Sequence, residues 1–139
     1  LHGPERGGIL TQGAVLTVTS YPTRTSPVLR GKWILENVLG SPPPPPPPNV
    51  PDLAESAASS AKDLRAALEK HRSNAGCASC HARLDPLGFA LENYDATGTF
   101  RAAEDGAPVD ASASLPGGVN FAGPSGLKSV LMERRDEFV

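Results

Sequence analysis

Aromatic residues are scarce in this chain, at 5% of its 139 residues, so a core built from the protein alone is expected to be small. No apolar run approaches the roughly 20 residues that a membrane-spanning helix needs, which argues against a transmembrane segment. The net charge is -2 and there is no basic patch, which argues against a nucleic-acid partner. By contrast, the chain has 14 glycines and 15 prolines, so much of it is expected to be loop or extended.

The only two cysteines lie together in the segment Cys77-Ala78-Ser79-Cys80-His81. This Cys-x-x-Cys-His spacing is typical of the covalent attachment of a c-type haem. Thiols at this spacing can reach the two vinyl groups on one haem edge, while the adjacent imidazole binds the iron from one face. We therefore predict one covalently attached haem c, with Cys77 and Cys80 as thioether anchors and His81 as the proximal ligand. The haem would also add a large apolar disc to a small core.

Three other interpretations of these residues remain open. Structural zinc needs four tetrahedral ligands, but the chain has no second cysteine pair and no histidine after His81. A thioredoxin-like dithiol normally lies at the start of a helix in a βαβ pattern, which this sequence does not show. A short-range disulfide or two unpaired thiols would leave the adjacent histidine unexplained.

His71 is one candidate for the ligand on the opposite face of the iron. A helix is predicted over 55–72, and in it Leu64, Leu68 and His71 fall at i, i+4 and i+7, on the buried side. The five residues between His71 and Cys77 can span roughly 16 to 20 Å, enough for the chain to pass round the haem edge. Alternatively, His71 is a core or capping histidine bonded to a carbonyl or a haem propionate.

Met132 is the rival candidate, because a methionine thioether downstream of the motif is a common axial ligand in electron-carrying cytochromes. Its helix phase argues against it. In the C-terminal helix predicted from about residue 125, Met132 lies well over a quarter turn from the centre of the apolar stripe. That stripe is formed by Leu127, Val130, Leu131 and Phe138.

Seven consecutive prolines, Pro42 to Pro48, set the expected organisation, because such a run holds a stiff polyproline II conformation. We interpret it as a spacer and divide the chain into an N-terminal segment (1–41), a polyproline linker (42–51) and a haem-binding domain (52–139). The predicted fold class is mainly α with long irregular and Pro-rich segments: a cytochrome c-like haem domain plus a small N-terminal arm that contains a helix.

Within the N-terminal segment, β-branched residues predict a strand over 9–20, followed by a turn at 21–25. Ser26 followed by Pro27 is typical of a helix start, so a helix is predicted over 27–39, with Trp33 as a core anchor.

After the motif, the segment 85–89 is predicted to be a turn that closes the attachment helix. Leu84 and Leu87 are expected to line the haem pocket, and Phe89 is expected to contribute apolar surface near it. Residues 101–124 are predicted to form a loop or loose hairpin. Carboxylates in and near this region could suggest calcium, but no EF-hand spacing is present and solvated loop carboxylates are favoured. These residues are Asp95, Glu104, Asp105 and Asp110.

Three segments carry a resemblance to known families: TVTSYPTRTSPVLRGKWILENVLGSPPPPPPPNVPDL, LEKHRSNAGCASCHARLDPLGFALENYDATG and RRDEFV. In this order they resemble two domains of unknown function, DUF1588 over the N-terminal segment 1–41 and DUF1585 over the haem-binding domain 52–139. These paired domains occur at the C-terminal end of large, haem-containing, DUF1592-associated secreted proteins of planctomycetes and related bacteria. The resemblance implies a larger parent polypeptide, so this chain is expected to be a fragment or a processed subunit.

The resemblance carries residue roles over to five positions only. Cys77, Cys80 and His81 match the family's attachment motif, and His71 and Arg72 match its His-Arg pair. The family often has Met or Ile where Leu84 stands, so that position is not expected to be an obligatory ligand.

Together these observations predict a single-haem electron-transfer module. Its expected partners are redox proteins or a larger complex, with peripheral membrane association as one possibility. Because bacteria attach haem outside the cytoplasm, the expected location is periplasmic or extracytoplasmic. Whether the chain is also an enzyme stays open: a peroxidase-like or oxidase-like site with an open sixth position is one alternative, and a haem-stapled structural adaptor is another.

Overall fold

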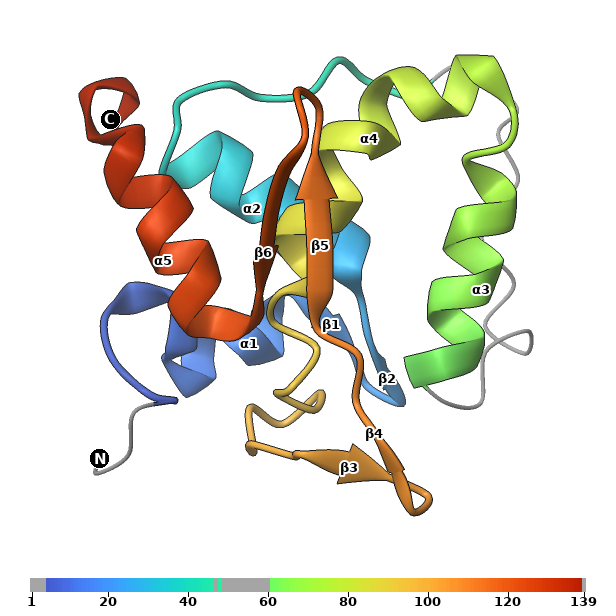
Figure 1. Ribbon diagram of the computed structural model, residues 1–139, viewed down its shortest axis with the longest axis vertical. Coiled ribbons are helices and arrows are strands. Elements are labelled where there is room, and N and C mark those ends of the chain that lie inside the picture. Colours follow the sequence, from blue (N-terminus) through green and yellow to red (C-terminus); the bar gives the residue numbers. More distant parts are fainter. Residues whose placement is uncertain (1–4, 47, 49–60, 139) are drawn as a thin grey trace.

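The computed structural model describes residues 5–46, 48 and 61–138 (Figure 1). In that part of the chain, helices are combined with three antiparallel two-stranded hairpins. The elements are, in chain order, η1 (Ile9–Thr11), α1 (Gly13–Val18), β1 (Ser20–Tyr21), β2 (Arg24–Thr25), α2 (Pro27–Asn37), α3 (Ala61–His71), α4 (Ala75–Phe89), β3 (Ala103–Glu104), β4 (Ala107–Pro108), β5 (Ser112–Leu115), β6 (Val119–Ala122), α5 (Gly123–Glu133) and η3 (Arg135–Glu137).

The strand predicted over 9–20 is wrong, because this segment folds as η1 and α1. Tertiary packing overrides the β preference of its side chains: Leu16 is fully buried in the core, and Gly98 lies directly against Gly13 and Leu16. The turn predicted at 21–25 is confirmed as the connection between β1 and β2, which pair antiparallel.

The helix predicted over 27–39 is confirmed as α2, which ends two residues earlier, at Asn37. The Ser26 hydroxyl accepts a hydrogen bond from the Leu29 amide at 3.2 Å, and Pro27 occupies the first turn, so the start follows the expected capping chemistry. The chain leaves the helix at Gly40, which has a φ of 54°. Trp33 is partly buried and packs against the core, as predicted.

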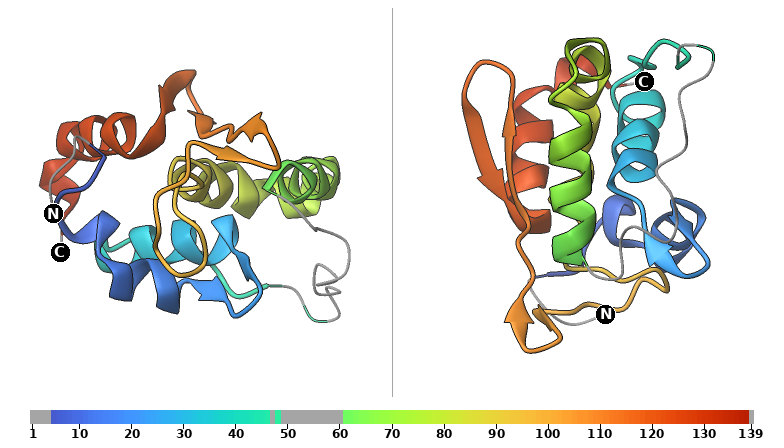
Figure 2. Two further views of the ribbon diagram at one scale, coloured as in Figure 1. Left: turned by 90° about the horizontal axis from the view of Figure 1, so that it is seen from below. Right: turned by 90° about the vertical axis from the view of Figure 1, so that its right-hand side faces the viewer.

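Helix α4 lies at the centre of the fold, with α2 on one side and the β5–β6 hairpin on the other (Figure 2). At two positions α2 and α4 approach backbone to backbone. A Cβ on Gly31 would overlap the Leu84 carbonyl oxygen, and a Cβ on Gly88 would overlap the Pro27 carbonyl oxygen. Only glycine permits contact this close.

One hydrophobic core joins residues from both sides of the polyproline run. Ile34 and Leu35 of α2 pack with Leu87 of α4 and Leu127 of α5 in the same cluster. The N-terminal segment is therefore part of the packing unit that holds the Cys-x-x-Cys-His motif, not an arm beside it. A smaller cluster joins Leu64 and Leu68 of α3 to Phe89.

The turn predicted at 85–89 is wrong, because α4 continues through Pro86 to Phe89. Proline costs a helix interior a hydrogen bond and some steric strain. Residues 84–89 are all buried here, between α2 and the β5–β6 hairpin, and this burial outweighs the local preference of proline.

The region 101–124 forms two hairpins, β3–β4 and β5–β6, where a single loop or loose hairpin was expected. The C-terminal helix begins at Gly123, and its stripe of Leu127, Val130 and Leu131 is buried as predicted. Phe138 was expected in that stripe, but it lies beyond the helix and is 43% exposed.

Arg30 of α2 is 1% exposed and binds the loop that follows α4. Its guanidinium donates to the carbonyl oxygens of Leu91 and Tyr94, both at 2.8 Å, and of Asp95 at 2.9 Å. It also pairs with the buried Glu92 carboxylate at 3.5 Å. Burial raises the pKa of Glu92 above its ordinary value, although Arg30 favours its ionised form, so this carboxylate depends on its cationic neighbours.

Arg30→Met is therefore expected to lower the free energy of unfolding by about 3–5 kcal/mol, because it leaves three buried carbonyls without their donor and takes from the buried Glu92 carboxylate one of its two arginine partners. Lys32→Met on the same helix removes only a surface pair with Glu36, so it should cost less than about 1 kcal/mol. Urea unfolding of both variants measures the difference. Equal losses of unfolding free energy in the two variants would show that the buried Arg30–Glu92 pair contributes no more to stability than the surface pair does.

Candidate functional site

The Cys-x-x-Cys-His motif occupies the first half of α4. Asn74 caps this helix, and its side-chain oxygen accepts a hydrogen bond from the Gly76 amide at 2.9 Å. Cys77, Cys80 and His81 follow at i, i+3 and i+4, which places them on one helix face. Both thiols are free and half-buried.

His81 is held by a carboxylate one helical turn further along. Its Nδ1 lies 2.9 Å from Oδ1 of Asp85, whose side chain is fully buried. A carboxylate acceptor at this distance favours the tautomer with the proton on Nδ1. The Nε2 of His81 is then free of that proton and able to bind a metal.

His71 is the last residue of α3 and lies against His81. The ring centroids are 4.8 Å apart and the ring planes meet at 74°. The predicted phase of this helix is confirmed where the structure describes it, since Leu64 and Leu68 are both 2% exposed. Residues 55–60 of the predicted helix lie outside the described residues. Two imidazoles from different helices are thus brought together beside the two thiols.

A cavity of about 500 Å³ opens at these side chains, a volume in the range of cofactor pockets. Helices α2, α3 and α4 all contribute to its lining, and so does the chain after α2, which runs across the top of the fold toward α4 in Figure 1. Its lining is formed by Val28, Leu29, Lys32, Pro43, Pro44, Pro45, Pro46, His71, Asn74, Gly76, Cys77, Cys80, His81 and Leu84.

Four prolines of the polyproline run are part of that cavity wall, although the sequence predicted a spacer. Prolines offer an apolar surface without amide hydrogens, so Pro43 to Pro46 can cover an apolar ligand and leave no donor unsatisfied. Part of the run, Pro47, lies outside the described residues.

The other predicted site residues have different positions. Leu84 lines the cavity as expected, whereas Leu87 lies in the main core and Phe89 in the smaller cluster, and neither lines it. Arg72 pairs with Asp85, its Nε lying 3.6 Å from Oδ2. Met132 is 57% exposed on α5 and is not among the lining residues.

Comparison with known proteins places the chain in a family. Residues 6–104 match the family described as "Protein of unknown function (DUF1588)". The chain belongs to the DUF1588 family. The match runs from the N-terminal segment through the polyproline run and both histidines of the cavity, well past the 1–41 range expected for this domain. No curated protein and no solved structure matches the chain.

DUF1585 was expected over residues 52–139, but residues 52–104 lie within the DUF1588 match, so the DUF1585 resemblance stays a prediction for residues 105–139 alone. The part of the chain that the structure describes contains no helix long and apolar enough to cross a membrane.

Sequence reasoning missed Asp85 and the proline wall of this DUF1588 chain. Asp85 lies at i+4 from His81, a spacing that indicates contact on a helix. Pro86, at the next position, led to the prediction of a turn, so the i, i+4 spacing of His81 and Asp85 was not recognised as a helical contact. The role of the prolines depends on how α2 and α4 pack, which no local pattern reveals.

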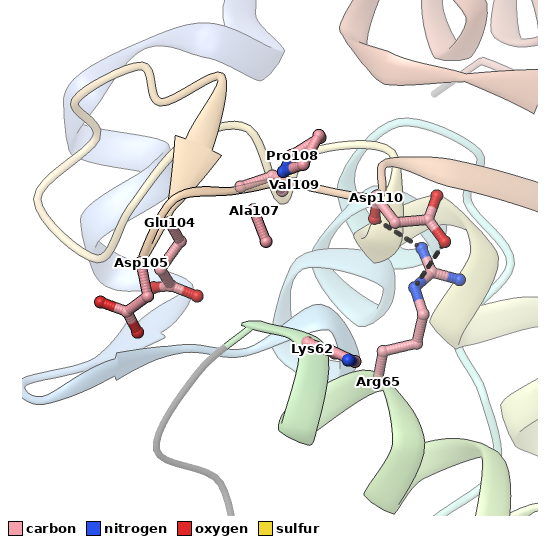
Figure 3. A pocket seen from close by; sticks show the side chains of 8 residues that line it. All are labelled: Lys62, Arg65, Glu104, Asp105, Ala107, Pro108, Val109 and Asp110. Atoms are coloured by element: carbon pink, nitrogen blue, oxygen red, sulfur yellow. Dashed lines mark hydrogen bonds and ion pairs between the residues drawn. The ribbon is translucent and has the colours of Figure 1, made fainter.

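A second cavity, of about 340 Å³, lies between the start of α3 and the region of β3 and β4 (Figure 3). The carboxylates considered for calcium do not converge there. Glu104 and Asp105 lie on one side, whereas Asp110 faces Arg65, its Oδ2 lying 3.5 Å from Nε. Hydrogen bonds from Ser112 hold the pKa of Asp110 below its ordinary value, so its charge is already partnered.

The residues of the first cavity fit a covalently attached haem. The thiols and the His81 imidazole share one helix face, the His71 imidazole lies edge-on against that of His81, and apolar side chains and prolines form most of the remaining wall. A metal between two imidazoles needs a nitrogen at about 2 Å on each side, so the rings must part by roughly one or two ångströms. The movement falls at the end of α3, whose last residue is His71.

Proposed function

We propose that this chain binds one haem c covalently and transfers electrons as a module of a larger protein or complex. The observation that carries the proposal is the pair of imidazoles, His71 and His81, whose ring centroids lie 4.8 Å apart beside two free thiols. Two thiolates and two imidazoles also match a ligand set of structural zinc, but the apolar cavity beside them suits a haem, whereas a zinc ion needs no such space.

The attachment chemistry needs only what the chain and the cofactor provide. Each thiol, on Cys77 and Cys80, adds its sulfur to one carbon of a vinyl group and its hydrogen to the other. One carbon–sulfur bond forms and one double bond becomes single, so no external oxidant takes part. Both thiols must be reduced and accessible, and both are free and half-buried in this chain.

When bound, haem iron supplies one-electron chemistry between the ferric and ferrous states. The side chains of the cavity define how that chemistry is used. His81 and His71 would hold the iron, which would leave it no open position for a substrate and favour outer-sphere electron transfer. Leu84 and the prolines exclude water from the surrounding wall.

The proposed location is periplasmic or extracytoplasmic, because bacteria attach haem to this motif outside the cytoplasm. Redox proteins or a larger complex are the proposed partners, with peripheral membrane association included. Two alternatives have weaker support. A peroxidase-like site would use Arg72 beside an open sixth position, but Arg72 pairs with Asp85. An adaptor with a free N-terminal arm does not agree with the shared core.

His71→Ala is expected to convert a six-coordinate, low-spin haem into a high-spin one, because it removes the proposed second axial ligand. Visible spectra of the oxidised and reduced protein, with and without carbon monoxide, measure the change. The variant should bind carbon monoxide readily, whereas the unchanged chain should not.

Met132→Leu provides the matched control, since it removes the rival ligand from an exposed position, and its spectrum should equal that of the unchanged chain. If the His71→Ala spectrum stays low-spin while Met132→Leu becomes high-spin, the axial assignment is reversed. A high-spin spectrum of the unchanged chain would favour the open, reactive site.

A further inference from the structure

Asp85 is a fully buried carboxylate that contacts His81, a residue of the cavity wall, and Arg72. One oxygen, Oδ1, lies 2.9 Å from Nδ1 of His81. The other, Oδ2, lies 3.6 Å from Nε of Arg72 and, within the described residues, forms no hydrogen bond. The carboxylate thus connects the helix that carries His81 with the residue that directly follows His71.

Burying a carboxylate is costly, so its presence calls for a gain elsewhere. Stability does not account for it, because an apolar side chain inside α4 would pack between Leu84 and Pro86 without that cost. Nor does Asp85 link α2 to α4, since among the described residues its side chain makes polar contacts only with His81, by a hydrogen bond, and with Arg72, by an ion pair. The gain must lie in what the carboxylate does to the two imidazoles.

We propose that Asp85 is a positioning residue that orients both imidazoles and biases the iron toward its ferric state, an inference that rests on the proposed haem site. The hydrogen bond to Nδ1 fixes the ring plane of His81 and leaves Nε2 free for a metal. It also makes the imidazole a stronger donor to the iron, as carboxylate–histidine pairs do at other metal centres.

Arg72 has the second part in this arrangement. Because it follows His71 directly, its ion pair with Asp85 holds the end of α3 against α4. Its positive charge also offsets part of the carboxylate's charge, and its side chain is 27% exposed, so the offset is incomplete. The charges of Asp85 and Arg72 therefore shift the balance between ferric and ferrous iron in opposite directions. Both residues nevertheless help to hold the imidazoles in place.

This opposition supplies the test, which uses the full chain with haem attached and measures its midpoint reduction potential. Asp85→Asn keeps the size of the side chain and removes its charge, so it should favour the reduced iron about tenfold, a rise of about 59 mV for one electron. Arg72→Gln removes the cation and should favour the oxidised iron a few-fold. Both variants should keep a low-spin spectrum.

Asp110→Asn is the matched control, because Asp110 also pairs with an arginine of α3 but contacts no histidine. Its potential should equal that of the unchanged chain. The inference is overturned if Asp85→Asn leaves the reduction potential unchanged. It is also overturned if Asp85→Asn and Arg72→Gln shift the potential in the same direction, because loosened packing alone would produce that result. If Asp85→Asn does not fold, a raised or unmoved potential in Arg72→Gln overturns it.

The failure of this inference is distinct from the failure of the proposed function. An unchanged chain that carries no covalent haem overturns both. A coloured, low-spin chain in which the variants leave the potential unmoved overturns the role of Asp85 alone.

Discussion

Replacing Cys77 and Cys80 together by serine is expected to abolish covalent haem attachment. Serine keeps the size of each side chain but its hydroxyl does not form the thioether bond, so no link to the cofactor remains. The chain should be produced where bacteria mature c-type cytochromes, and intact-mass measurement should find the polypeptide alone, without the added mass of haem. Any haem that remains in the cavity should be removed by acid-acetone extraction.

Variants of each cysteine alone, and of the nearby Ser79, make the experiment specific. Cys77→Ser or Cys80→Ser should each leave one thioether, with a visible spectrum changed by the remaining vinyl group. Ser79→Ala alters one of the two residues between them, an exposed one, and should attach haem as the unchanged chain does. Equal haem content in the double variant and in Ser79→Ala would contradict the assigned role of the thiols.

Gly31→Ala and Gly88→Ala are each expected to destabilise the fold by more than about 3 kcal/mol, at or beyond the upper end of ordinary overpacking. The added methyl would meet a backbone carbonyl, of Leu84 in one case and of Pro27 in the other. Backbone cannot move aside as a flexible side chain can, so α2 must separate from α4. The stability of a small domain is only about 5–15 kcal/mol, which makes this a large fraction.

Gly13→Ala is the matched control, because it also lies in a helix and a Cβ there would meet nothing within 4 Å. It should leave stability unchanged or raise it slightly, since alanine favours the helix more than glycine does. Denaturant unfolding followed by circular dichroism compares the three variants. If all three variants lost the same amount of stability, the close approach of α2 and α4 would not be the reason why alanine destabilises the fold at Gly31 and Gly88.

Local chemistry in the sequence was enough for two parts of this molecule. The Ser26–Pro27 pair marked the start of α2 correctly, because capping depends on residues that are adjacent in the chain. The stripe of Leu64 and Leu68 placed His71 correctly at the end of α3, because helical phase is a local property.

Tertiary packing decided the parts that the sequence did not predict. The β-branched segment before Ser20 became a helix because Leu16 is buried against Gly98, which is distant in the chain. Pro86 remained inside a helix because its surroundings are buried on both sides. The hydrogen bond between His81 and Asp85 and the proline wall of the cavity both follow from these arrangements.

The most direct test of the central claim is the visible spectrum of the purified chain, oxidised and reduced, recorded after acid-acetone extraction. The account predicts colour that stays with the polypeptide and low-spin bands in both states, as expected for haem held by two thioethers and two imidazoles. A colourless chain after maturation in a cytochrome-competent host would contradict it. The Cys-x-x-Cys-His segment would then be a dithiol or disulfide beside two histidines.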